Sequence, residues 1–268
     1  MKKIFVFFSL LIFILNYTQV KENLVIPKNP KIGLSLAGGG AKGFAHVGVL
    51  KVLDSLGIKV DYVSGTSMGA IVGGLYASGY TGKDIEKIVM ETDFYNLLSN
   101  ANNRAETSFF NKSVDKYLLK VPIKNGKVTL PSSISSGQKN IYLLKELFKN
   151  VSNIQDFSKL PIPFLCVATN LESGKMKVFE KGDISESIMA SSAFPSLMDP
   201  VKIGDSIYVD GAMTVNYPSE LLKKKGIDIV IGVDLNQGLN TRDKINSIVD
   251  ILIQVIDFGI VKETKNQL

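Results

Sequence analysis

Residues 60–77, VDYVSGTSMGAIVGGLYA, give the clearest indication of the fold. The first four residues of this stretch predict a short strand, and the last ten predict a helix rich in small residues. Between them lies the pattern G-x-S-x-G, centred on Ser67, which is typical of a nucleophile elbow when it joins a strand to a helix. The turn in such an elbow is so sharp that the residues two before and two after the serine must be small, which accounts for Gly65 and Gly69. The alternative is an ordinary glycine-rich loop.

A second glycine-rich turn, GGGAKG at residues 38–43, joins a strand predicted at 32–36 to a helix predicted at 44–56. Consecutive glycines leave backbone N–H groups open to a bound group, and the following helix adds the positive end of its dipole. Such a loop suits a developing oxyanion or a phosphate. It also matches the dinucleotide pattern G-x-G-x-x-G, but the expected acid would be Asp61, which lies at the start of the next strand. Dinucleotide binding is therefore the weaker alternative.

Strands and helices alternate along much of the remaining chain. This alternation predicts an α/β fold, with a mostly parallel central sheet and helices on both faces, in a three-layer sandwich. An irregular insertion is expected at residues 99–140, with a short helix near 114–119, and a hairpin is expected through Gly204 and Asp205. The remaining expected helices are 84–98, 142–149, 184–192, 219–225 and 244–261, and the remaining expected strands are 164–169, 177–179 and 229–233.

Length and composition indicate one large globular domain, because 268 residues with 45% apolar side chains can bury a substantial core. The formal charge of +6 indicates solvated lysines, with weak attraction to anionic lipid headgroups as the alternative. Nucleic acid is not an expected partner, because no cluster of Lys and Arg stands out in the sequence. The single cysteine, Cys166, excludes an internal disulfide and a cysteine-based metal site, and its apolar neighbours predict that it is buried.

The N-terminus has the pattern of an export signal. Lys2 and Lys3 precede an apolar run at residues 4–15, which is too short to span a bilayer comfortably. The expected division of the chain is a signal peptide at 1–20, a linker at 21–30 and a folded domain at 31–268. We therefore expect export, to the medium, the cell surface or the outer membrane. An uncleaved membrane anchor is the alternative, because no clear small-x-small cleavage site follows the run.

A third motif, Asp210-Gly211-Ala212, follows a strand expected at 207–209 and by itself is typical of a turn. The only histidine, His46, precedes Ser67, whereas a Ser-His-Asp triad on an α/β-hydrolase sheet places its histidine after the acid. We therefore expect His46 to be a packed or capping residue. If Ser67 is a nucleophile, another group must take its proton. A carboxylate is the best candidate, since Lys42 would need a strongly lowered pKa.

The three motifs resemble, in order, those of the patatin-like phospholipase family, and ASSAFP at residues 190–195 resembles the segment that this family carries before its aspartate motif. The resemblance runs from about Lys31 to Asp234 and implies a patatin-like fold with a Ser-Asp dyad, Ser67 being the nucleophile and Asp210 the base. It implies an oxyanion hole formed by the backbone N–H groups of Gly38, Gly39, Gly40 and Met68. The supporting motif residues are Lys42, Gly43, Gly65, Gly69 and Gly211. The family often has Arg where Lys42 stands, and lysine keeps the charge but loses the planar fork.

The resemblance further implies a serine hydrolase that cleaves carboxylic esters of phospholipids or other acyl lipids at a membrane surface, without cofactor or metal. The insertion at 99–140, with Phe109 and Tyr117, is either a mobile cap over an acyl channel or simply packed on the core. A non-catalytic storage or surface-binding protein on the same fold is one alternative, and a dinucleotide-binding oxidoreductase is another. A signal followed by such a domain also resembles the secreted passenger of outer-membrane autotransporters.

Overall fold

The computed structural model describes residues 27–98, 123–124, 127–128, 133–236, 238–246 and 248–265. The predicted signal at 1–20, the short helix predicted near 114–119 and most of the predicted linker lie outside these residues. The chain separates into two compact units, residues 1–30 and 31–268, and the second contains all the helices and strands of the described part. Within the described residues, no helix is both long enough and apolar enough to cross a membrane.

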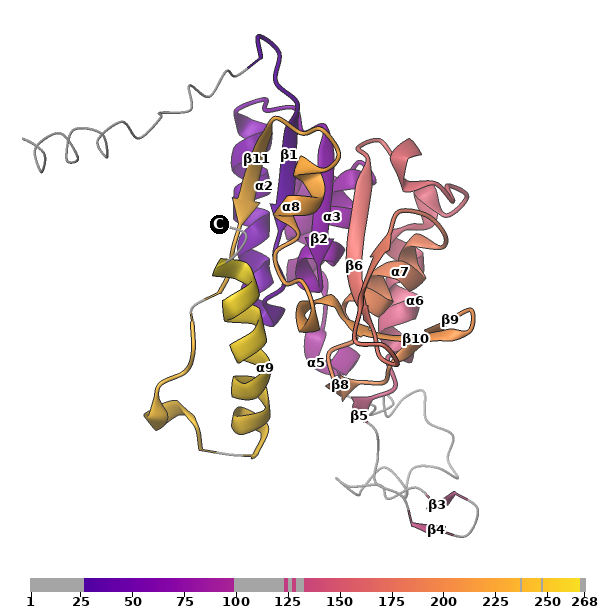
Figure 1. The fold of residues 1–268 in the computed structure, drawn as a ribbon. Helices are drawn as coiled ribbons and strands as arrows, with labels where there is room; N and C mark the ends of the chain where they lie inside the picture. The colour runs from indigo at the N-terminus through magenta and orange to yellow at the C-terminus, as the bar shows by residue number, and fades with distance from the viewer. Residues whose placement is uncertain are drawn as a thin grey trace, which may run out of the picture. The chain divides into compact units, whose positions relative to one another are not determined.

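A seven-stranded sheet forms the middle layer of the second unit. Its strands are β1 Ile32–Leu36, β2 Tyr62–Thr66, β6 Phe164–Asn170, β7 Met176–Phe179, β9 Val201–Ile203, β10 Ser206–Asp210 and β11 Ile229–Val233. They follow the order β11-β1-β2-β6-β10-β9, with β7 paired to β6. The strands β11, β1, β2 and β6 are parallel neighbours and lie side by side in Figure 1. The other three are antiparallel to their partners, and the predicted hairpin at Gly204 and Asp205 joins β9 to β10.

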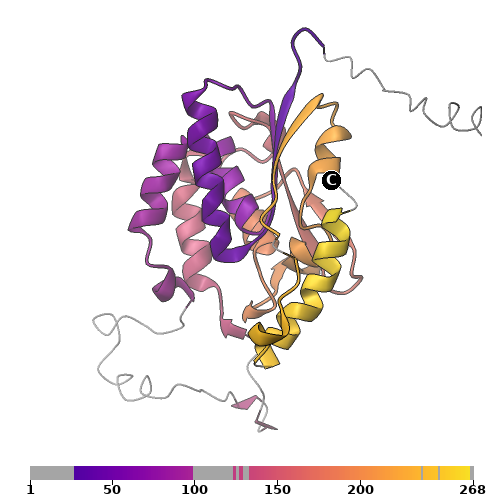
Figure 2. The same ribbon diagram turned by 90° about the vertical axis from the view of Figure 1, so that its left-hand side faces the viewer.

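Helices cover both faces of this sheet, so the predicted α/β layer architecture is confirmed, with a mixed sheet in the middle. Figure 2 shows α2, α4 and α6 on one side of the strands and α8 and α9 on the other. The helices are α2 Ala45–Ser55, α3 Met68–Ala77, α4 Gly82–Glu91, α5 Phe94–Leu98, α6 Gln138–Leu147, α7 Ile184–Ser191, α8 Ser219–Lys223 and α9 Ile248–Lys265. Two small sheets pair β3 Ile123–Lys124 with β4 Lys127–Val128, and β5 Ser133–Ser135 with β8 Ser196–Met198.

Some helix boundaries differ from those predicted. The single helix expected at 84–98 is two helices, because the chain is extended at Thr92, whose hydroxyl donates to the Ile88 carbonyl and ends α4. The helix expected at 142–149 already begins at Gln138, directly after Gly137 in the left-handed conformation with φ 72°. The last helix lies four residues further along the chain than its predicted range.

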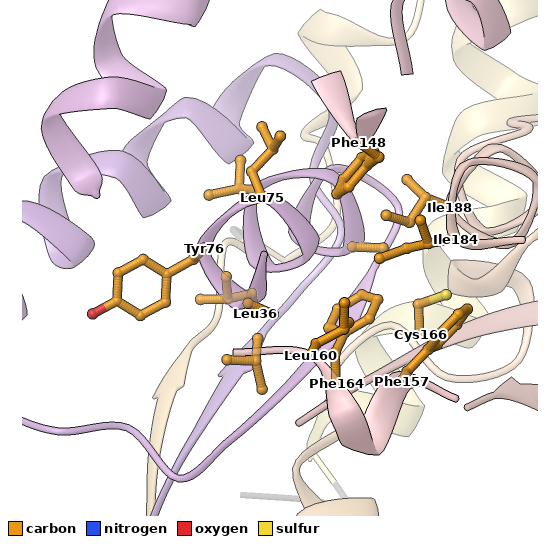
Figure 3. Packing of buried hydrophobic residues seen from close by; sticks show 14 of the residues in the cluster. Leu36, Leu75, Tyr76, Phe148, Phe157, Leu160, Phe164, Cys166, Ile184 and Ile188 are labelled. Atoms are coloured by element: carbon orange, nitrogen blue, oxygen red, sulfur yellow. The ribbon is translucent and has the colours of Figure 1, made fainter. Parts of the chain in front are cut away.

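Helix α3 lies close to the sheet because its glycines leave room for β2. A Cβ at Gly73 would lie only 2.9 Å from Cγ1 of Val63. The apolar core around α3 is shown in Figure 3, and its buried side chains include Leu36, Leu75, Phe148, Phe157, Phe164 and Ile188. Each fully buried side chain of this kind stabilises the fold by about 1.5–3 kcal/mol. Cys166 is buried with them, as predicted, and burial raises the pKa of its thiol.

Two strands meet end to end along one edge of β6. Strand β2 runs parallel to β6 and ends with Thr66 opposite Val167. Strand β10 runs antiparallel to β6 and ends with Asp210 opposite Ala168, the next residue of β6. Since β7 pairs with the same part of β6, it occupies the other edge. The carboxyl ends of β2 and β10 therefore face each other, which brings residues 67 and 210 together although 143 positions separate them.

Candidate active site

Ser67 occupies a sharp turn between β2 and α3. Its backbone angles, φ 55° and ψ −123°, lie in a region that non-glycine residues rarely adopt. Such a conformation costs about 1–3 kcal/mol and persists only where the surroundings impose it. A Cβ at Gly65 would lie 2.4 Å from the carbonyl oxygen of Gly69, and a Cβ at Gly69 would lie 2.1 Å from that of Leu36. The sharp turn therefore excludes larger residues at both positions, and Ser67 itself stays partly exposed.

The Ser67 hydroxyl lies against a buried carboxylate. Its Oγ donates to Oδ2 of Asp210 at 2.6 Å. The other carboxylate oxygen, Oδ1, accepts the backbone N–H of Ala212 at 2.8 Å and so caps the short 3₁₀ helix η6, Gly211–Met213. Only 1% of Asp210 is exposed, and burial raises the pKa of its carboxyl to about 6, against the two hydrogen bonds, which lower it. The Ser67 hydroxyl is thus bonded to a carboxylate whose pKa is about 6.

His46 is packed inside the protein, in agreement with the prediction. It is fully buried in α2, and its Nε2 bonds to the carbonyl oxygen of Ala37 at 2.8 Å. Because a carbonyl can only accept, Nε2 must carry the proton of this bond. Burial lowers the pKa of the ring, which keeps it neutral at physiological pH. His46 therefore ties α2 to the residue that follows β1.

The glycine loop contacts the proposed nucleophile, Ser67, at Gly38. A Cβ at this position would lie 3.1 Å from Cβ of Ser67 and 2.6 Å from Oδ1 of Asn216, so only glycine allows this approach. The N–H of Gly38 donates to the carbonyl oxygen of Asn216 at 3.1 Å. It is therefore not free to bind an oxyanion, and the prediction that Gly38 is a donor in the oxyanion hole is wrong for this arrangement. Gly38 instead holds the start of the loop close to Ser67 and Asn216.

Three N–H groups of the predicted oxyanion hole stay open. That of Gly39 makes no backbone hydrogen bond among the described residues. Gly40 is the first residue of the 3₁₀ helix η1, Gly40–Phe44, and Met68 is the first residue of α3. The N–H groups in the first turn of a helix have no partner inside the helix and point outward along its axis. The loop and the elbow thus each contribute N–H groups able to bind an anion.

The other predicted motif residues have identifiable places. Gly43 packs under Met68, where a Cβ would lie 2.1 Å from its Cγ, and so holds η1 against α3. Gly211 packs against β6, where a Cβ would lie 2.2 Å from the carbonyl oxygen of Val167. Lys42 is exposed on the loop. The two glycines are required for close packing, whereas nothing of that kind restrains the lysine.

Two other kinds of site find no support. In the dinucleotide alternative, Asp61 would bind a ribose near the glycine loop. Its Oδ2 instead accepts the N–H of Ile32, the first residue of β1, at 2.8 Å, whereas the loop follows the last residue of that strand. In the part of the chain that the structure describes, no group of His, Cys, Asp and Glu could hold a metal ion.

Two buried residues at this site had no local signal in the sequence. The backbone carbonyl oxygen of Asn216 accepts the N–H of Gly38. The backbone N–H of Asn216 donates to Oε2 of Glu263 in α9 at 3.0 Å. Ser191, at the end of α7, accepts the N–H of Ser67 through its Oγ at 3.0 Å. Only the position of Ser191 within the segment 190–195 pointed to this region. Both residues act through contacts that form when distant segments pack together.

Comparisons with known proteins identify the family of this chain. A family model described as Patatin-like phospholipase matches residues 34–223, a range that includes all three motifs. The lysophospholipase NTE1 of Debaryomyces hansenii is 35% identical over 210 residues, which are 78% of this chain and 12% of that protein. An uncharacterized NTE family protein of Mycobacterium tuberculosis is 26% identical over 208 residues, which are 78% of this chain and 50% of that protein. The chain thus spans half or less of the length of these relatives.

Among solved structures, VipD from Legionella pneumophila aligns with a TM-score of 0.43 and 17% identity, over 85% of this chain and 52% of that one. The type III effector ExoU aligns with a TM-score of 0.38 and 17% identity, over 90% of this chain and 54% of that one.

Proposed function

The chain belongs to the patatin-like phospholipase family, and we propose that it is a serine hydrolase that cleaves carboxylic esters of lipids with Ser67 as nucleophile and Asp210 as base. The observation that carries this proposal is the 2.6 Å hydrogen bond from the Ser67 hydroxyl to the buried carboxylate. His46, the only histidine of the chain, is bonded to Ala37 instead. Asp210 is therefore the base within reach of the nucleophile.

The first half of the reaction forms an acyl-enzyme. As Oγ of Ser67 attacks the ester carbonyl, its proton moves to Oδ2 of Asp210 and the carbonyl oxygen becomes an oxyanion. The tetrahedral intermediate then collapses, the bond to the leaving oxygen breaks, and Asp210 returns the proton to the departing alcohol. A carboxylate with a pKa of about 6 suits this exchange, because it is ionised at neutral pH and yet more basic than an ordinary aspartate.

The oxyanion is stabilised by backbone N–H groups. We assign this role to Gly39 and Gly40 of the loop, with Met68 of the elbow as a further donor. Their N–H groups are held before the substrate arrives, so they bind the developing charge without a reorganisation cost. This assignment narrows the predicted set of four donors to three, because the N–H of Gly38 is already bound to Asn216.

The second half of the reaction releases the fatty acid. Water replaces the alcohol, gives its proton to Asp210 and attacks the ester that joins the acyl group to Ser67. The same N–H groups bind the second oxyanion, and the proton returns to Oγ of Ser67 when the acid leaves. Water enters, acid leaves, and both catalytic residues end in their starting protonation states.

Lysophospholipids are the first substrates to test, because the yeast relative is named a lysophospholipase. Diacyl phospholipids and other acyl lipids belong to the same ester class. We further propose that the enzyme works at a membrane surface after export. When the chain is expressed in a Gram-negative host, we expect about 20 residues to be removed from its N-terminus. Intact-mass measurement of the exported protein checks this expectation, and soluble cytoplasmic protein with an unprocessed N-terminus would contradict it.

The proposal is tested by labelling with a fluorophosphonate and by lipid hydrolysis. We expect the folded wild-type protein to form an adduct on Ser67, identified by peptide mass spectrometry, and to release fatty acid from lysophosphatidylcholine. The Ser67→Ala variant should do neither. Asp210→Asn, which keeps the nucleophile, should label far more slowly. A folded wild-type protein that forms no adduct and cleaves neither lysophospholipids, diacyl phospholipids nor other acyl lipids would overturn the proposal in favour of a storage or binding protein.

A further inference from the structure

The last residue of α7 makes two hydrogen bonds that join the nucleophile to the sheet. Ser191 is fully buried. Its Oγ accepts the backbone N–H of Ser67 at 3.0 Å and donates to the carbonyl oxygen of Val167 in β6 at 2.6 Å. A serine hydroxyl has one proton, and Val167 can only accept it. The Ser191 hydroxyl therefore donates its proton to Val167 and accepts the N–H of Ser67 with a lone pair of its oxygen.

The N–H that Ser191 binds makes no other hydrogen bond in the described part of the chain. Ser67 precedes the first residue of α3, so its N–H lies outside the hydrogen bonds of the helix. Loss of the Ser191 hydroxyl would leave this N–H without a hydrogen-bond partner, which is unfavourable. The hydrogen bond to Ser191 thus stabilises the strained conformation that points the Ser67 side chain out of the turn.

The same short segment also holds the second member of the pair. Two residues after Ser191, the carbonyl oxygen of Ala193 accepts the backbone N–H of Asp210 at 2.9 Å. The backbone N–H groups of Ser67 and Asp210 are therefore both bonded to residues 191–193. Since β2 and β10 meet only end to end, no hydrogen bond between these two strands fixes their distance.

We propose that Ser191 is a positioning residue, whose hydroxyl fixes the backbone of Ser67 so that Oγ points at Asp210. This inference rests on the proposed function, because positioning has a catalytic meaning only if Ser67 attacks an ester. Ser191 touches neither substrate nor the transferred proton. Its loss should therefore lower turnover without removing the nucleophile, the base or the oxyanion donors.

The neighbouring residue provides a matched control. Ser192 is also buried and also a serine, but its Oγ donates to the carbonyl oxygens of Ile188 and Met189 in its own helix, at 2.9 and 3.3 Å. Replacing either serine by alanine removes one buried hydroxyl and little volume. Only Ser191→Ala removes a contact to Ser67.

We expect Ser191→Ala to lower kcat about 10- to 100-fold, which is the size of effect that a small misplacement of a reacting group produces. KM on a short-chain ester should change little, and Ser191→Thr, which keeps the hydroxyl, should recover part of the loss. Ser192→Ala should keep kcat within about twofold of wild type. Thermal unfolding of each variant identifies losses that come from unfolding instead of from position.

A second measurement does not depend on catalysis. The amide proton of Ser67 should exchange slowly with solvent in wild type and in Ser192→Ala, and faster in Ser191→Ala. Wild-type kcat together with unchanged exchange in folded Ser191→Ala would overturn the proposal, and so would equal losses in the two alanine variants. If the wild-type protein cleaves no ester, the proposed function fails, whereas the exchange experiment still decides whether Ser191 holds Ser67.

Discussion

The elbow at residues 65–69 and the loop at residues 38–43 are both glycine-rich turns between a parallel strand and a helix, yet one glycine of the loop meets a need that the elbow glycines do not. In the elbow, a Cβ at Gly69 would lie 2.1 Å from backbone oxygen. In the loop, Gly40 has φ +53° and no atom within 4 Å of a Cβ built on it. The elbow glycines are required by packing, whereas Gly40 is required by its backbone conformation. A glycine in a motif therefore does not by itself show whether close packing or the backbone conformation requires it.

The two turns also contribute to different parts of the proposed reaction. The elbow is buried apart from its two central residues, and it fixes the group that forms the covalent bond. The loop is exposed from Gly39 to Lys42, and it supplies N–H groups that matter only when negative charge develops. Substitutions in the elbow should therefore abolish chemistry or folding, whereas substitutions in the loop should leave a folded but slower enzyme.

The largest effect should come from the pair at the elbow. We expect Ser67→Ala and Asp210→Asn each to lower kcat about 10⁴- to 10⁶-fold, which is the range seen when a nucleophile or its base is removed from a serine hydrolase. The double variant should be little worse than Ser67→Ala alone, because the two residues act as one unit. Single-turnover and steady-state kinetics on a soluble ester measure these effects. Additive losses in the double variant would show that the two residues act independently.

The next largest effect should come from the loop. Gly39→Val should lower kcat about 10²- to 10³-fold, because the branched side chain meets Leu235 and tilts an oxyanion donor. KM should change much less than kcat. Gly48→Ala in α2, where a Cβ meets no atom within 4 Å, is the control and should keep full activity. A change confined to KM would mean that the loop binds the substrate and gives no special stabilisation to the transition state.

A smaller effect, on stability, separates the two kinds of glycine directly. Gly69→Ala should lower the free energy of unfolding by about 3 kcal/mol or more, because its Cβ meets a backbone oxygen that cannot move aside. Gly40→Ala should cost only about 1–2 kcal/mol, the strain of a left-handed conformation in open space. Urea denaturation followed by circular dichroism measures both values. Equal losses of unfolding free energy in Gly69→Ala and Gly40→Ala would contradict the distinction between a glycine required by packing and one required by its backbone conformation.

The smallest effect should be that of His46 on the pH profile. Asp210 must be ionised to accept a proton, so a pKa of about 6 predicts that kcat/KM falls as the pH drops through 6 and levels off above it. Burial lowers the pKa of His46, and the ring bonds to the carbonyl oxygen of Ala37 and not to Ser67. His46→Gln should therefore leave the acid limb where it is. The profile of a well-folded His46→Gln protein decides the matter, and disappearance of the limb would identify the histidine as the base.

Local patterns predicted several elements well. The strands at 32–36 and 229–233 and the helix at 68–77 have their predicted bounds. The helix expected at 84–98 was wrong as a single element, because its break depends on one hydroxyl, that of Thr92, bonding back to a carbonyl.

Long-range contacts are what the sequence could not reveal. Asn216 looks like any other polar residue, and the segment 190–195 does not show what Ser191 bonds to, until α7 and the segment after η6 reach the strand ends. The occupied N–H of Gly38 depends on the same docking. Motif spacing could name the nucleophile and its partner acid, but it carries no information about which backbone groups other segments will bind.

The end-to-end meeting of β2 and β10 has a consequence for the protein while it is being made. The ribosome adds the nucleophile 143 residues before the base. At about 5–20 residues per second, this interval lasts roughly 7–30 seconds. During that time the growing chain has the elbow but lacks β10, so it cannot activate its serine. If Ser67 and Asp210 act as proposed, the enzyme is inert toward the membranes of the cell that makes it until the carboxyl-terminal part of its sheet has been synthesised and docked.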